Sequence, residues 1–212
     1  MHSLDSVTFD TSGFSAPRHD GNQRVWETPD GDPVTLYFFG KPSPRSARPA
    51  AIDAWRAAAR DGVRDARGAI VEVEPVTLDG RAAIREIVKV PQGRTGMGYL
   101  GSLMLPFGAF GFMLSIAARE RGTTGMRDTL VLMKLMQSGV VRFPEGADQP
   151  AGWMADPYDP AIATPPGRNL SDDPEYDAIF PDHPLSRVRR TLARIEATMR
   201  LAAELKGETA DW

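Results

Sequence analysis

The feature that most constrains this chain is a stretch of 24 residues without a formal charge, Thr95–Ala118, which lies between Arg94 and Arg119. A stretch of this length could cross a bilayer as a helix. However, five glycines and Pro106 interrupt it, and these residues disfavour a continuous helix and favour turns. We therefore predict two buried strands, Tyr99–Leu105 and Phe110–Ala117, joined by a turn at 106–109. A membrane-inserting hairpin is the disfavoured alternative, because irregular backbone cannot be satisfied against lipid.

Composition excludes several classes of site. The chain has 212 residues, a formal net charge of −3 and no cysteine. Disulfides, thiol nucleophiles and cysteine-based metal centres are therefore excluded. A chain of this length can bury a core without a disulfide or metal cross-link. The slightly acidic balance argues against nucleic acid as a partner. The first six residues have neither the basic nor the apolar segment of a secretory signal, so we expect a cytoplasmic protein.

The segments around the uncharged stretch predict an α+β fold with a twisted antiparallel sheet. Asp79-Gly80 is typical of a tight hairpin turn, and the connections are too short for parallel crossovers. The predicted elements are strands at Val7–Phe9 and Val34–Phe39, a helix at Ala50–Val63, a hairpin of Ala69–Val73 with Arg81–Val90, and a helix at Arg127–Ser138 that carries Leu130, Met133 and Met136.

Composition changes near residue 144. Residues 145–184 hold eight prolines and nine acidic residues, and Arg168 is their one basic residue. This composition predicts an extended acidic arm without long regular structure. The arm nevertheless keeps Trp153, Tyr158, Tyr176 and Phe180, whereas disordered tails are poor in aromatic residues. We therefore expect the arm to lie against the domain.

A basic amphipathic helix is predicted after the arm. Asp182-His183-Pro184 is a helix-start signal, and we expect the helix to continue to about Lys206. Its apolar residues follow a heptad seam, which Leu201 and Leu205 broaden: Leu185, Val188, Leu192, Ile195, Met199 and Ala202. Packing on its own domain is favoured over pairing with a partner or with a second copy. The predicted division is a domain at 1–143, the arm at 144–184 and the helix at 185–212.

Three motifs suggest chemistry, and each has a plainer structural interpretation. Gly96–Gly101 has the spacing of a dinucleotide-binding loop, but no helix is predicted after it, so the glycines favour a strand entry. His183 and Ser186 are three residues apart on one helix turn, where capping is more common than catalysis. The carboxylates of Asp172, Asp173, Glu175 and Asp177 do not have calcium-loop spacing and are better explained by solvation or by pairing with arginines. We predict no catalytic residue, no metal and no cofactor.

Residues 5–140 resemble the PsbP-like fold family. The resemblance rests on Val7–Phe9 and Val34–Phe39 before the helix with Trp55, on the hairpin sequence Val76–Ala83, and on two final strands before a short helix. This fold is shared by the extrinsic P subunit of photosystem II, a Ran-binding nuclear import factor and bacterial chaperones of type VI secretion effectors. The resemblance covers about two thirds of the chain, and it implies a sheet packed between helices with a non-enzymatic binding role.

The sequence therefore predicts a non-catalytic protein-binding module, a chaperone, adaptor or immunity-type protein of a bacterial secreted effector. An apolar groove beside strands 99–118 would bind a partner helix, with the aromatic residues of the arm as anchors. Such residues contribute most of the binding energy at protein interfaces. The predicted partner-contacting residues are Trp153, Tyr158, Tyr176, Phe180, Phe107 and Phe110. We expect a protein partner, no nucleic acid and no stable membrane insertion, with homodimer formation through the last helix as an option.

Two alternatives remain open at this point. The chain could be a small-ligand binder or hydrolase-type enzyme, with a pocket between arm and sheet that contains Asp172, Asp177 or His183. It could also attach to a membrane surface through 95–118.

Overall fold

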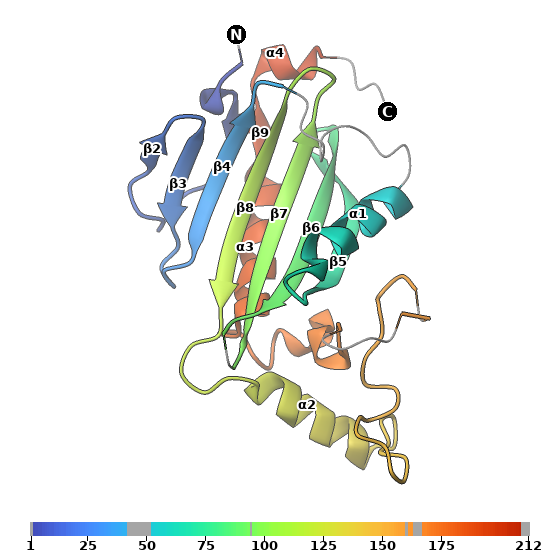
Figure 1. Ribbon diagram of the computed structural model, residues 1–212. Helices are drawn as coiled ribbons and strands as arrows, with labels where there is room; N and C mark the ends of the chain where they lie inside the picture. The colour runs from blue at the N-terminus through green and yellow to red at the C-terminus, as the bar shows by residue number, and fades with distance from the viewer. Residues whose placement is uncertain (1, 42–51, 94, 160, 163–166, 209–212) are drawn as a thin grey trace.

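A seven-stranded antiparallel sheet forms the centre of the protein (Figure 1). The computed structural model describes residues 2–41, 52–93, 95–159, 161–162 and 167–208. In spatial order the strands are β2 (Arg18–Asp20), β3 (Gln23–Glu27), β4 (Pro33–Phe39), β8 (Gly111–Arg119), β7 (Met97–Pro106), β6 (Arg81–Pro91) and β5 (Ala69–Leu78). A separate short pair joins β1 (Val7–Thr8) to β9 (Arg200–Leu201).

Helices cover both faces and one end of this sheet. They are α1 (Ile52–Arg64), α2 (Met126–Gln137), α3 (Pro184–Thr198) and α4 (Ala203–Lys206), with 3-10 turns η1 (Leu4–Ser6), η2 (Leu170–Asp172) and η3 (Pro174–Tyr176). Figure 1 shows α3 behind the sheet, α1 in front of β5 and β6, and α2 beyond the lower end of the strands. The predicted α+β class with an antiparallel sheet is confirmed.

The uncharged stretch forms the two strands that were predicted. β7 and β8 pair with each other and occupy interior positions of the sheet, where Leu103 and Leu114 are fully buried. The predicted turn between β5 and β6 is also present, because Asp79 and Gly80 adopt positive φ angles of 47° and 84°. Within the part of the chain that the structure describes, no helix is long and apolar enough to span a membrane.

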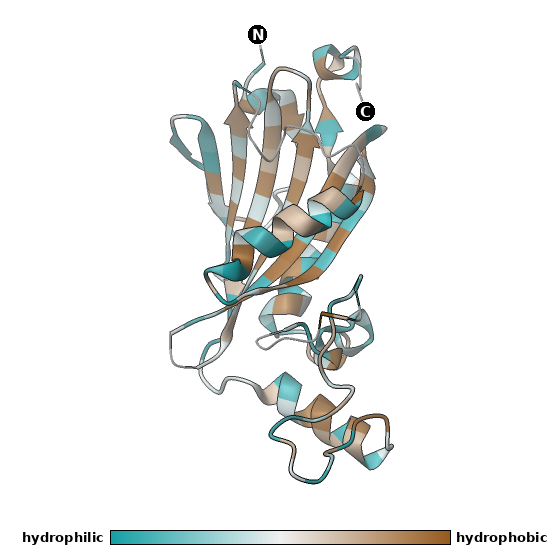
Figure 2. Ribbon diagram, turned by 45° about the vertical axis from the view of Figure 1, so that its right-hand side comes forward, coloured by the Kyte–Doolittle hydropathy of each residue, from teal (hydrophilic) through white to brown (hydrophobic). Residues whose placement is uncertain are grey.

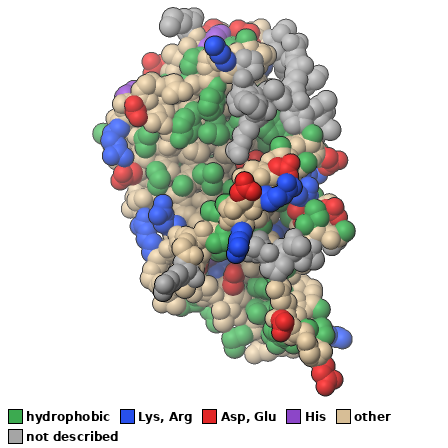
Figure 3. All heavy atoms as spheres, in the orientation of Figure 1, with side chains coloured by type: hydrophobic (Ala, Val, Ile, Leu, Met, Phe, Trp, Pro, Cys, Tyr) green, Lys and Arg blue, Asp and Glu red, His purple; other side chains and the backbone are tan. Residues whose placement is uncertain are grey.

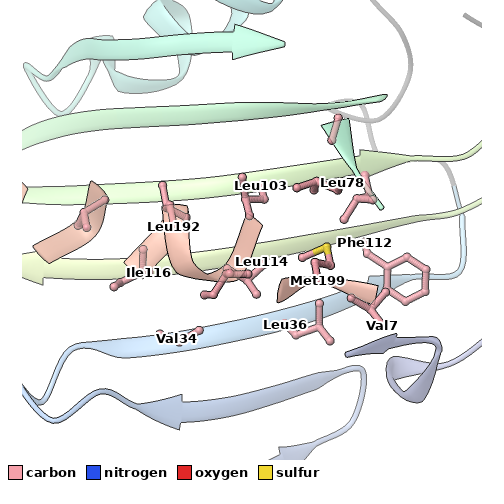
Figure 4. Packing of buried hydrophobic residues seen from close by; sticks show 14 of the residues in the cluster. Val7, Val34, Leu36, Leu78, Leu103, Phe112, Leu114, Ile116, Leu192 and Met199 are labelled. Atoms are coloured by element: carbon pink, nitrogen blue, oxygen red, sulfur yellow. The ribbon is translucent and has the colours of Figure 1, made fainter. Parts of the chain in front are cut away.

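The larger core lies between the sheet and α3. The predicted seam of α3 faces the strands, and Val188, Leu192 and Ile195 are fully buried there. Figure 4 shows Leu192 and Met199 beside Leu103, Leu114 and Ile116 of β7 and β8. This helix therefore packs on its own domain.

The smaller core lies between the sheet and α1. Trp55, Ala59 and Val63 of the predicted apolar stripe are buried against β5, β6 and β7. The helix was predicted over Ala50–Val63, and residues 50 and 51 lie outside the described residues. The described helix ends one residue later than predicted, at Arg64.

The prediction that the last helix continues to Lys206 is wrong. α3 ends at Thr198, and Arg200–Leu201 forms a strand that pairs with Val7–Thr8. The N–H of Leu201 donates to the Asp79 carboxylate at 2.9 Å, which gives this backbone group a partner outside a helix. Leu201 and Leu205 are still buried, but they reach the core from β9 and α4 and not from a continuous helical face.

The glycines of Gly96–Gly101, which have the spacing of a dinucleotide-binding loop, lie at the start of β7. Gly96 precedes β7 with a φ of 82°, while Gly98 and Gly101 lie within the strand, which continues to Pro106. At Gly101 α3 approaches the sheet so closely that a Cβ atom would lie 2.5 Å from Val188 and 2.7 Å from Leu192. The strand-entry interpretation is confirmed, and Gly101 sets how closely α3 packs.

Gly101→Ala is expected to destabilise the protein by about 1–3 kcal/mol, because the new methyl group would overpack the contact with α3. Gly98→Ala in the same strand is the matched control, since its Cβ would meet no atom closer than 3.8 Å. Urea unfolding of both variants tests the packing, and equal effects of the two substitutions would contradict it.

Candidate functional site

α2 and the arm fold together into a third, smaller core at the lower end of the sheet. Val131 and Val141 are buried there against Trp153 and Tyr176, and Phe180 packs at the edge. The N–H of Leu170 donates to the carbonyl of Trp153, which holds two parts of the arm side by side. As the aromatic content predicted, the arm lies against the rest of the protein.

A buried ion pair connects this unit to the sheet. The Nζ atom of Lys89, on β6, lies 2.5 Å from a carboxylate oxygen of Asp172, and the two side chains are 2% and 0% exposed. Burial alone would raise the pKa of Asp172, but the Lys89 ammonium and the Asn169 N–H outweigh it and hold that pKa below its usual value. In the same cluster, burial and the nearby Asp172 raise the pKa of the Tyr99 hydroxyl well above its usual value. The contact between Lys89 and Asp172 therefore fixes the arm on β6.

Arg127 connects α2 to the same cluster. Its guanidinium is almost fully buried and donates to the carbonyls of Ser171 and Asp173 at 2.7 and 3.0 Å. It also donates to the Asp177 carboxylate and the Ser186 hydroxyl, each at 2.9 Å. One side chain of α2 thus holds both the arm and α3, and this fixes the orientation of α2.

The acidic cluster of the arm is neutralised by cations of this chain. Asp172 pairs with Lys89, Asp173 with Arg168, and Asp177 with Arg127 and Arg189. Among the described residues, no group of three or more acidic or histidine side chains is placed to hold a metal ion. The predicted pairing with arginines is confirmed at Asp177, whose partner Arg189 lies on α3.

His183 caps α3 and is hydrogen-bonded within the protein. Its Nδ1 atom accepts the N–H of Leu185 at 3.3 Å, and its Nε2 atom lies 3.7 Å from the Glu120 carboxylate. Burial would raise the pKa of Glu120, but His183 and the N–H groups of Gly125 and Met97 lower it overall. The capping role is confirmed, and the Ser186 hydroxyl donates to Asp177 at 3.0 Å.

His183 and Glu120 line a cavity of about 370 Å³ between α2 and the start of α3. Of the three residues assigned to an alternative ligand pocket, only His183 lines this cavity. Asp172 lies in the buried ion pair, and Asp177 accepts partly buried hydrogen bonds from Arg127 and Ser186.

α2 carries apolar side chains on its outer side as well as on its buried side. Met126, Leu130 and Met133 follow helical spacing, so they share one side, and they are 52%, 49% and 52% exposed. Val131 and Leu135 lie on the opposite, inward side. Figure 2 shows apolar residues along the middle of α2, and Figure 3 shows hydrophobic side chains on the lowest part of the molecule. We call Met126, Leu130 and Met133 the α2 apolar face.

The apolar exposure continues beyond the helix. Met136, Val140 and Phe143, at and after the end of α2, are 40%, 60% and 50% exposed, and Ile179 of the arm is 60% exposed. A helix that is apolar all round is normally buried, and a gathered exposed apolar area marks an interaction site. Methionine suits such a site, because its flexible thioether adapts to different partner surfaces.

The six residues predicted to contact a partner lie mainly in the protein's own cores. Trp153 and Tyr176 are buried in the third core beside Phe180, and Phe107 and Phe110 stack at 4.6 Å in the largest core. Tyr158 packs against the α1 core, where its hydroxyl lies 2.5 Å from the N–H of Val73 and Arg56 covers its ring. Their role in partner binding stays a prediction, and little of the four buried rings, those of Trp153, Tyr176, Phe107 and Phe110, is left for another chain to contact.

The predicted groove beside the 99–118 strands is occupied by α3 on one side of the sheet. Val188 and Leu192 fill the space above Gly101 where a partner helix was expected. The α2 apolar face was not recognised from the sequence, although Leu130, Met133 and Met136 were used to predict the helix. The feature of the sequence that could have revealed this face is a second set of apolar residues on the other side of the same helix, Val131, Leu132 and Leu135.

Comparison with known proteins adds no function. No protein-family model matches the chain. No curated protein matches it. A crystal structure from Bacteroides thetaiotaomicron VPI-5482 is similar at 13% sequence identity and a TM-score of 0.35. The alignment covers 55% of this chain and 39% of the Bacteroides chain. A likeness this weak carries no argument about what the protein does.

Asp172→Asn is expected to lower the free energy of unfolding by about 3–5 kcal/mol at pH 7, because it leaves the buried Lys89 ammonium without its counter-charge. Asp173→Asn is the control: its pair with Arg168 is partly exposed, so a loss of at most about 1 kcal/mol is expected. Urea unfolding measures both.

The pH dependence gives a second readout of the same pair. The folded-state pKa of Asp172 is lowered, so the pair stabilises fully above the unfolded-state value of about 4 and loses its effect as the pH falls through the lower folded-state value. Wild type should therefore lose stability more steeply in acid than Asp172→Asn. Equal stability of the two proteins at pH 7 would contradict the role of the pair.

Proposed function

We propose that this protein is a non-catalytic binding module for another protein, and that the α2 apolar face receives the partner. The observation that carries the proposal is the exposure of Met126, Leu130 and Met133 on one side of a helix whose other side is already buried. Leaving these side chains in water forgoes the stabilisation of their burial, about 1.5–3 kcal/mol for each fully buried side chain. A partner that covers them would recover that stabilisation.

The mode of binding that fits this face is the packing of an amphipathic helix. The three side chains follow the spacing of a helix stripe, which pairs naturally with a second apolar stripe. The adjoining Val140, Phe143 and Ile179 widen the area beyond a single seam. The partner is therefore proposed to present an apolar helix face of three or more turns.

The buried network supports recognition because it orders the face before binding. Arg127, one residue after Met126, is held by four hydrogen bonds to the arm and α3. The helix thus does not have to be ordered when a partner arrives, which lowers the entropic cost of association.

In the narrower form of the proposal the protein is a cytoplasmic chaperone, adaptor or immunity-type protein for a bacterial secreted effector. The support for this form is the resemblance of residues 5–140 to the PsbP-like family, which includes chaperones of type VI secretion effectors. The face on α2 is independent of that resemblance. A partner of another kind would leave the binding proposal intact and remove only the narrower form.

Photo-crosslinking in the native host tests the proposal. A photoreactive residue at position 130 or 133 is expected to crosslink one defined protein, whereas the same residue at the exposed Ala57 of α1 is not. With that partner purified, Leu130→Lys combined with Met133→Lys should weaken binding at least about tenfold, because two apolar contacts are replaced by charges. Calorimetry or fluorescence anisotropy measures the affinity.

Ala57→Lys, an exposed change on α1, is the control and should leave the affinity within about twofold. The double substitution should change the free energy of unfolding by no more than about 0.5 kcal/mol, because both side chains already face solvent. Unchanged affinity in the double variant, or crosslinking at Ala57 and not on α2, would refute the α2 apolar face as the binding surface.

A further inference from the structure

A second cavity, on the other side of the arm from α2, is lined mainly by arginine and apolar side chains. It measures about 490 Å³ and lies between the end of α1, the start of β5 and the arm. Its charged lining residues are Arg60, Arg64, Arg67, Arg168 and Asp156, which gives four positive charges against one negative. Its volume is within the range of small-molecule sites, about 300–1,000 Å³.

Arg60 is one of the four arginines, and its charge is already neutralised within the protein. Arg60 makes a bidentate pair with Asp156, with both nitrogen–oxygen distances at 2.7 Å. The same carboxylate accepts the N–H groups of Tyr158 and Asp159, so the pair has little freedom to rearrange. The excess positive charge at this cavity therefore comes from Arg64, Arg67 and Arg168.

These three arginines have donors that the protein does not use. Arg67 makes no side-chain hydrogen bond or ion pair to the residues that the structure describes. Among the described residues Arg64 pairs with Asp61 alone, on the same exposed helix turn, and such a pair exchanges readily with solvent or ligand. Arg168 pairs with Asp173 through one nitrogen, but its Nε atom is buried without a hydrogen-bond partner.

Arg67 also occupies a backbone position that favours glycine. Its φ is 53°, in the left-handed turn that ends α1, and its N–H donates to the carbonyl of Arg64. Gly68 follows it and cannot carry a side chain, because a Cβ there would lie 2.6 Å from the carbonyl oxygen of Lys89. A residue other than glycine is uncommon at such a position.

We propose that this cavity binds a small organic phosphate. Three guanidinium groups at one cavity match the charge of a phosphate dianion better than that of a single carboxylate. The apolar side of the cavity, formed by Val63, Ile70 and Ile162, contacts an apolar or aromatic body attached to that phosphate. The site is separate from the α2 apolar face, and its occupancy does not depend on the proposed protein partner.

A titration of the full chain with phenyl phosphate, benzoate and inorganic phosphate tests the proposal by nuclear magnetic resonance and calorimetry. Phenyl phosphate is expected to bind most tightly and to shift the amides of Arg64, Gly68 and Ile70. Inorganic phosphate lacks the apolar body and benzoate lacks the second charge, so both are expected to bind at least about tenfold more weakly.

Arg67→Gly separates a binding role from a structural one. It removes one guanidinium while relieving the left-handed backbone, so it should weaken phenyl phosphate at least about tenfold and keep or raise the melting temperature. Arg18→Gln, on the exposed β2 strand, is the charge-matched control and should bind as wild type does. Equal affinity in wild type and Arg67→Gly, equal weakening by Arg18→Gln, or no binding of phenyl phosphate at millimolar concentration would overturn the proposal.

Discussion

The ion pair between Lys89 and Asp172 is the contact on which the lower half of the molecule depends. A charge buried without a partner is strongly unfavourable, so the buried Lys89 of β6 requires a carboxylate beside it. That carboxylate comes from the arm, 83 residues away along the chain. Once Asp172 is fixed, Ser171 and Asp173 present their carbonyls to Arg127, and α2 is held in turn.

This order of dependence explains how a proline-rich acidic segment becomes a structured part of the protein. Where the structure describes the arm, its backbone forms only 3-10 turns and isolated bridges, because proline and the local charges disfavour longer elements. Its order comes from side chains, namely the buried Trp153 and Tyr176 and the paired carboxylates. The arm therefore acts as a connector between the sheet, α2 and α3.

The fold was largely predictable because its signals are local. The glycines and Pro106 predicted the break between β7 and β8, and Asp79-Gly80 predicted a hairpin turn. The spacing of Trp55, Ala59 and Val63 predicted α1. The end of α3 was not predictable, because the strand at Arg200–Leu201 exists only through pairing with Val7–Thr8 almost 200 residues earlier. A heptad pattern that continues through Met199 cannot reveal a partner strand at the other terminus.

The candidate sites were less predictable, since each depends on which side of an element is left uncovered. The aromatic residues of the arm suggested partner anchors, yet burial within the fold uses most of their surface. Conversely, Met126, Leu130 and Met133 resemble core residues in the sequence and are exposed only because the opposite side of α2 faces the third core. The arginines of the second cavity are likewise brought together from α1 and the arm by tertiary structure.

The sheet, the arm and α3 hold α2 in place and leave its outer apolar side exposed. Native-state hydrogen exchange of the full chain measures the rigidity of α2 directly, through the opening free energies of the amides of Val131 in α2 and Leu103 in β7. We expect α2 to open within about 2 kcal/mol of the sheet, because both belong to one cooperative unit. An opening free energy near zero throughout α2, with full protection of β7, would contradict it.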